Sequence, residues 1–168
     1  MDNTFRYVAV CILVFLLQVL VANHIDLGPY IFIGLLPLIL MHIPASTSDA
    51  LRMLIAFVLG LLLDITTDGV TGLHAGAATI LGALCGPIYR NRINSDWRND
   101  SGIPSVRTIG PGYTLYAIIA SLIYICAYIL LECATFRPFW FILLRILLST
   151  AVSALLTVII GRSLFRGR

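Results

Sequence analysis

Long apolar segments alternate with short polar ones along the chain. The apolar segments cover residues 7–22, 30–43, 50–67, 72–89, 113–131 and 138–160. A helix of about 20 apolar residues crosses the roughly 30 Å of hydrocarbon in a bilayer, so this pattern predicts an all-α integral membrane protein. We expect residues 1–168 to form one membrane domain, a single bundle of six transmembrane helices.

Two local signals refine this prediction. Pro37 lies in the middle of the second apolar segment, where it predicts a kinked helix shielded by its neighbours. Ser48 or Asp49 precedes the third segment and is placed to cap that helix.

The composition excludes an ordinary soluble domain. Of the 168 residues, 60% are hydrophobic and 11% are charged, whereas soluble domains carry about 25% charged residues. The four cysteines lie within or at the ends of apolar segments, without the close spacing of metal ligands or of a disulfide framework. We interpret them as small buried hydrophobic residues.

The arginines predict the orientation in the membrane. All eleven basic residues are arginines, and in a six-span arrangement nine of them fall on the side that holds both termini. Arg137 falls on the opposite side, and Arg145 falls within the last span. By the positive-inside rule, both termini and the polar loop at residues 90–112 are cytoplasmic. The net charge of +3 therefore reports topology and not nucleic-acid binding.

Asp64 ends the purely aliphatic part of the third segment. If that helix enters the membrane near Arg52, Asp64 lies about 18 Å further along it, at ~1.5 Å per residue. A carboxylate at that depth costs about 2.5–3.5 kcal/mol on insertion scales unless it faces protein or water. We therefore expect Asp64 to be buried between helices, with Asp68 close to the outer surface.

Arg145 lies inside the last span and needs a partner. It lies about 12 Å beyond Arg137, at ~1.5 Å per residue, on the side from which Asp64 also approaches. A buried Asp64–Arg145 pair is one hypothesis. Glu132 is the competing partner for Arg145, and snorkelling of the arginine to the outer surface is a third possibility.

Small residues crowd the fourth segment. Gly72 and Gly76, and Gly82 and Gly86, are each four residues apart, which fits the small-xxx-small pattern of close helix contacts in lipid. We expect a helix contact within the chain more than a partner-binding face. The residues assigned to helix packing or to a partner interface are Gly60, Asp64, Asp68, Gly69, Gly72, Gly76, Gly82, Gly86 and Arg145.

Other polar residues within the spans are few. Gln18 is the one strongly polar residue of the first segment. The fifth segment carries Ser121, Tyr124 and Tyr128 along one side, and the sixth carries a polar line of Ser149, Ser153 and Thr157.

The sequence carries no signature of an enzyme. Asp64 and Asp68 are four residues apart on one segment, unlike the two aspartates of intramembrane proteases, and Asp68-Gly69 lacks the further aspartates of a phosphoalcohol transferase. No nucleophile elbow, phosphate loop or metal-ligand cluster is present, and the three histidines occur singly. We expect no catalytic residues, no cofactor and no metal.

The segment FVLGLLLDITTDGVTGLHA at residues 57–75 resembles the signature of the rod shape-determining MreD family. In that family an aliphatic helix with Gly followed by Asp leads through a Ser/Thr/Gly elbow into a helix of small residues. Leu16-Leu17-Gln18, the proline of the second span, and Phe136-Arg137-Pro138 before the last helix also match. The loop at residues 90–112 departs from the family, in which it is usually shorter.

This resemblance implies a non-enzymatic scaffold of the cell-wall elongation complex in the bacterial cytoplasmic (inner) membrane. Its expected partners are a bitopic MreC-like protein, an MreB-like actin homologue, and a RodA-type polymerase with its penicillin-binding transpeptidase. The lipid bilayer surrounds it, and no nucleic acid is expected.

MreD-like proteins are similar in fold to the S-components of energy-coupling-factor vitamin transporters, which supplies the alternative. In that case the six helices would enclose an outward-facing vitamin pocket. The residues available to line it are Asn23, His24, Asp26, Asp68, His74, Glu132 and Trp140.

Overall fold

A computed structural model describes residues 3–24, 28, 30–67, 70–93, 103–105, 109–132 and 138–164. All regular secondary structure among these residues is helical. The elements are α1 (Asn3–His24), α2 (Leu36–Met41), α3 (Asp49–Thr66), α4 (Leu73–Ile88), the π-helix η1 (Tyr89–Ile93), α6 (Gly112–Glu132) and α7 (Phe139–Leu164). The predicted all-α class is therefore confirmed.

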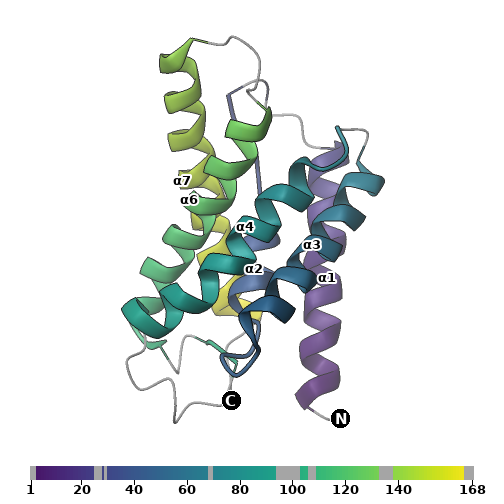
Figure 1. Ribbon diagram of the computed structural model, residues 1–168, viewed down its shortest axis with the longest axis vertical. Helices are drawn as coiled ribbons and strands as arrows, with labels where there is room; N and C mark the ends of the chain where they lie inside the picture. The colour runs from purple at the N-terminus through teal and green to yellow at the C-terminus, as the bar shows by residue number, and fades with distance from the viewer. Residues whose placement is uncertain are drawn as a thin grey trace.

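The helices form one elongated bundle in which α1 begins and α7 ends at the same end (Figure 1). Helices α3 and α4 form an antiparallel hairpin, α4 packs on α6, and α6 packs on α7. The short α2 lies among these helices, and all six of its residues are buried. Helix α1 lies along the side of the bundle, where the Tyr7 hydroxyl donates a hydrogen bond to the carbonyl of His42 over 3.0 Å.

The surface and the interior have the polarity of a membrane protein. Large apolar side chains are exposed along the long helices, among them Ile12, Leu54, Ile65, Leu147 and Leu155. Buried positions include Gln18, Asp64, Arg145, Ser149 and Ser153. An apolar exterior of this extent disfavours a free existence in water and fits contact with lipid tails.

Three helices of the described chain are long and apolar enough to cross a bilayer: Tyr7–His24, Gly112–Glu132 and Phe139–Leu164. The other two long helices, α3 and α4, do not meet both the length and the composition expected of a membrane span. Helix α4 has 16 residues, and α3 contains Asp49, Arg52 and Asp64.

The sequence predicts one kinked helix over residues 30–43, and this prediction is wrong. Residues 31–35 have no regular secondary structure, and the helix covers only Leu36–Met41. Pro37 stands in the first turn of α2 and not in its middle. Proline lacks an N–H group and has a fixed φ, so it fits a helix start better than a helix interior.

A non-helical stretch inside a membrane protein leaves its backbone groups without helical partners. Side chains from α1 and α7 supply those partners. The bonds are Phe32 N–H to Ser149 Oγ (2.9 Å), Gly34 N–H to Ser153 Oγ (3.0 Å), Leu35 N–H to Gln18 Oε1, Gln18 Nε2 to the Ile33 carbonyl (3.3 Å) and Ser153 Oγ to the Phe32 carbonyl (3.4 Å). The unwound segment is thereby held between α1 and α7.

Helix α3 begins where the sequence predicts. Ser48 is its N-cap, and the Ser48 side chain accepts a hydrogen bond from the backbone N–H of Leu51. Of the two candidates for this cap, the serine fills the role, and Asp49 lies in the first turn.

Candidate functional site

The Asp64 carboxylate joins the end of α3 to the beginning of α4. Its Oδ2 accepts hydrogen bonds from the backbone N–H groups of Gly72 (2.9 Å) and Ala75 (3.0 Å), and its Oδ1 accepts one from His74 (3.0 Å). Asp64 is 2% exposed. Asp64 is therefore buried between α3 and α4, as the sequence predicts.

The reason for this arrangement lies in helix chemistry. The first N–H groups of a helix have no partner within the helix, and the helix dipole places positive partial charge there. A carboxylate from a neighbouring helix satisfies both the hydrogen-bonding and the electrostatic need. Asp64 therefore acts as a capping group for α4, supplied from α3 across the elbow.

Gly72 makes the elbow possible through its backbone conformation. It is the N-cap of α4, with φ of 102°, in the left-handed region that favours glycine. A Cβ at Gly72 would meet no atom within 4 Å. Gly72 is thus a turn residue and not the helix-packing residue that its spacing from Gly76 predicts. Asp68 and Gly69 lie outside the described residues.

Two of the predicted glycines bring α3 and α4 into backbone contact. A Cβ built at Gly60 would lie 2.6 Å from the Cα of Ala75 and 2.6 Å from the His74 carbonyl oxygen. A Cβ at Gly82 would lie 2.8 Å from the Ala56 Cβ and 3.1 Å from the Arg52 carbonyl oxygen. The small-residue surface of α4 is therefore occupied by α3 of the same chain at these two positions.

Gly76 and Gly86 face side chains and not a neighbouring backbone. A Cβ at Gly76 would lie 3.0 Å from Cδ1 of Leu131, a flexible side chain of α6. Gly86 leaves room for the side chains of Arg52 and Asp49.

A second polar cluster lies at the other end of the α3–α4 hairpin. Arg52 is 3% exposed. Its Nη1 lies 3.2 Å from Oδ1 of Asp49, and its Nη2 donates to the Pro44 carbonyl over 3.0 Å. Arg90 pairs with the second carboxylate oxygen of Asp49. These bonds fasten the start of α3 to the residues that follow α4.

The hypothesis of an Asp64–Arg145 pair is wrong. Nη2 of Arg145 lies 2.8 Å from Oε2 of Glu132, so the competing partner is the one found. The carboxylate of Asp64 is already occupied by three backbone amides, whereas Glu132 ends α6 close to the inward-facing arginine of α7.

An aromatic cluster beside the elbow has no counterpart in the sequence predictions. Nδ1 of His74 lies 2.8 Å from the Tyr124 hydroxyl, and its ring stacks on Tyr128 with centroids 4.7 Å apart. Phe32 of the unwound segment stacks on Tyr128 at 4.1 Å with an interplanar angle of 9°. The cluster links the unwound segment, α4 and α6. The available signal was the presence of Tyr124 and Tyr128 on one side of the fifth apolar segment.

The chemistry of this region is that of a structural joint. Within the described ranges, no group of three or more His, Cys, Asp or Glu side chains is placed to hold a metal ion. The Asp64 oxygens and the His74 Nδ1 are engaged by partners from the protein. These contacts hold α3, α4 and α6 in fixed positions relative to one another.

Comparisons with protein-family models, with curated proteins and with solved structures found no match to this chain.

Proposed function

We propose that the chain is a non-enzymatic membrane scaffold of the MreD type, acting in bacterial cell-wall elongation. The observation that carries this proposal is the Asp64 elbow. The residues that resemble the MreD signature, from Gly60 through Asp64 to Gly72, are the ones that build the α3–α4 joint. Their contribution is to the shape of the joint, because three backbone N–H groups occupy the Asp64 carboxylate.

The proposal includes six crossings of the cytoplasmic membrane, with both termini in the cytoplasm. Three features support it. Helix α1 begins and α7 ends at one end of the bundle (Figure 1). The cluster of Asp49, Arg52 and Arg90 lies at the end of the hairpin opposite to the elbow. In a six-span arrangement, nine of the eleven arginines fall on the side of the membrane that holds both termini.

Cysteine labelling tests this topology. In a chain whose four native cysteines are replaced, Val70→Cys at the exposed elbow should react with an impermeant maleimide added outside intact cells. Arg162→Cys should react only after the membrane is opened. Labelling of both positions from one side would exclude the six-span arrangement.

The proposed partners are an MreC-like bitopic protein, an MreB-like actin homologue, and a RodA-type polymerase with its transpeptidase. Recognition between helices in lipid depends on close packing and polar contacts, because lipid gives no hydrophobic driving force. Gly60 and Gly82 are occupied inside the chain, so the partner surface uses other positions. The exposed faces of α1 and α7 are available for it.

Co-purification tests the scaffold role. The full chain, expressed with an MreC-like protein, should retain that protein on an affinity resin. Asp64→Ala should weaken retention by disturbing the joint, whereas Leu62→Ala, at a 46% exposed position of the same helix, should not. Equal absence of the partner from all three samples would contradict the proposal.

The alternative is a vitamin-binding S-component, and one observation favours it. The stacked rings of Phe32, His74 and Tyr128 are of the type that binds planar ligands, and the Glu132–Arg145 pair lies on the adjoining helices α6 and α7. A vitamin that stays bound through purification of the wild-type chain, and is lost in Tyr128→Ala, would support this alternative against the scaffold.

A further inference from the structure

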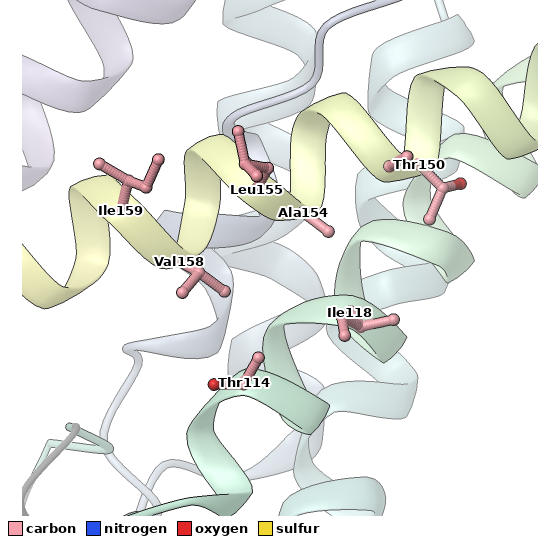
Figure 2. Close-up of a pocket in the computed structure, with 8 residues that line it drawn as sticks. Thr114, Ile118, Thr150, Ala154, Leu155, Val158 and Ile159 are labelled. Carbon is pink, nitrogen blue, oxygen red and sulfur yellow. The ribbon is translucent and has the colours of Figure 1, made fainter.

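A groove of about 390 Å³ opens on the surface between α6 and α7. Figure 2 shows Thr114 and Ile118 of α6 along one side, and Thr150, Ala154 and Val158 of α7 along the other. Its remaining lining residues are Ala151, Leu155 and Ile159. The lining is aliphatic apart from the two threonines, and Ile118, Leu155 and Ile159 are exposed. On a helix pair that is apolar enough to cross a bilayer, such a groove faces lipid tails.

The length of the groove matches one leaflet. Thr150 and Ile159 are nine residues apart on α7, which is about 14 Å at ~1.5 Å per residue. Half of a hydrocarbon core of roughly 30 Å is about 15 Å. The groove therefore has the length of an acyl chain within one leaflet.

A cation stands at the end of the groove that lies near the membrane surface. Arg162 follows Ile159 by about one helical turn, and its side chain is exposed. Its Nη2 donates to Oγ1 of Thr114, a lining residue, over 3.0 Å. Within the described part of the chain, no acidic side chain forms an ion pair with Arg162. Since a guanidinium has five N–H donors, most of them stay available for a phosphate.

We infer that the α6–α7 groove binds an anionic phospholipid, with one acyl chain between Thr150 and Ile159 and the headgroup phosphate on Arg162. Charge and length both support this occupant. The site is independent of the scaffold proposal, because it uses neither the elbow nor a protein partner.

A photoactivatable lipid tests the inference. The full chain is reconstituted in vesicles that contain phosphatidylglycerol with a diazirine in its acyl chain, or the same probe with a phosphatidylcholine headgroup. After illumination, labelled peptides are identified by mass spectrometry. We expect the phosphatidylglycerol probe to label the α6 and α7 peptides that line the groove, and the phosphatidylcholine probe to label them about five-fold less, because one arginine near the surface contributes about that factor.

Three variants locate the site. Ala151→Phe fills the groove from an exposed lining position, and should reduce labelling. Its matched control is Leu147→Phe, one turn earlier on α7 and outside the lining, which should leave labelling unchanged. Arg162→Gln should bring phosphatidylglycerol labelling down to the phosphatidylcholine level, and Arg162→Lys should retain most of the difference. Thermal unfolding establishes that each variant is folded.

Several results would overturn the inference. Equal labelling by the two probes would remove the headgroup contribution. Unchanged labelling in both Ala151→Phe and Arg162→Gln would place the lipid elsewhere. A crosslink from the groove to a second copy of the chain, or to another protein's helix, would identify a different occupant.

Discussion

Oδ1 of Asp64 accepts a hydrogen bond of 3.0 Å from the backbone N–H of His74, and the ring of the same histidine lies 2.8 Å from the Tyr124 hydroxyl. One residue thus connects the carboxylate of α3 with the tyrosine of α6. The backbone N–H and the side chain of His74 point to different helices, so the start of α4 is held from two directions. Four predictions test this connection, the close packing of the helices and the other polar contacts of the bundle.

The first prediction concerns the cap of α4. Asp64→Ala leaves three backbone N–H groups without their acceptor, at a cost of about 1–3 kcal/mol for each one that stays buried and unpaired. Asp64→Asn keeps one acceptor oxygen and should lose less. Thermal unfolding in detergent should give the order wild type, Asn variant, Ala variant. A wild-type unfolding temperature in Asp64→Ala would contradict the capping role.

The second prediction separates two glycines of the α3–α4 region. Gly60→Ala places a Cβ against the backbone of Ala75 and His74, which cannot move without separating the helices. We expect a loss of about 1–3 kcal/mol in the free energy of unfolding. Gly76→Ala meets only the flexible Leu131 side chain, and should be neutral or slightly stabilising, since alanine favours a helix. Equal effects of the two substitutions, measured by thermal unfolding, would refute this assignment.

The third prediction concerns the Glu132–Arg145 pair. Arg145 is 9% exposed, so Glu132→Gln leaves a buried guanidinium without its counter-charge. The cost should stay below the roughly 3–5 kcal/mol of a fully buried pair, because the Glu132 side chain is 31% exposed and partly screened. The double variant Glu132→Gln/Arg145→Gln should be more stable than Glu132→Gln alone. A double-mutant cycle without coupling would show that the pair contributes nothing.

The fourth prediction concerns the unwound segment at residues 31–35. Ser153→Ala removes the acceptor of the Gly34 N–H group and should cost about 1–3 kcal/mol. Thr157→Val is the matched control on the same helix face, because the Thr157 hydroxyl is buried without a hydrogen-bond partner in the described part of the chain. This control should be neutral or stabilising. If both variants unfold like the wild type, the serine does not hold the segment.

The sequence determined the features that depend on local composition. Apolar runs predicted a helical membrane protein, since burial in lipid requires hydrophobic residues whatever the neighbours are. The burial of Asp64 between helices could also be predicted, because the free-energy cost of exposing a carboxylate to lipid does not depend on the fold. Ser48 predicted the start of α3 in the same way, since a cap acts within one turn.

Tertiary structure decided which groups meet. The sequence indicated that Asp64 needs partners, but the amides at the start of α4 became those partners only when the elbow turned at Gly72. Arg145 met Glu132 and not Asp64, and the second segment unwound because serines of α7 and Gln18 of α1 were in reach of its backbone. In a medium of low polarity an unpaired backbone donor or acceptor is costly, and its partner is chosen by proximity in space, which the order of residues along the chain does not specify.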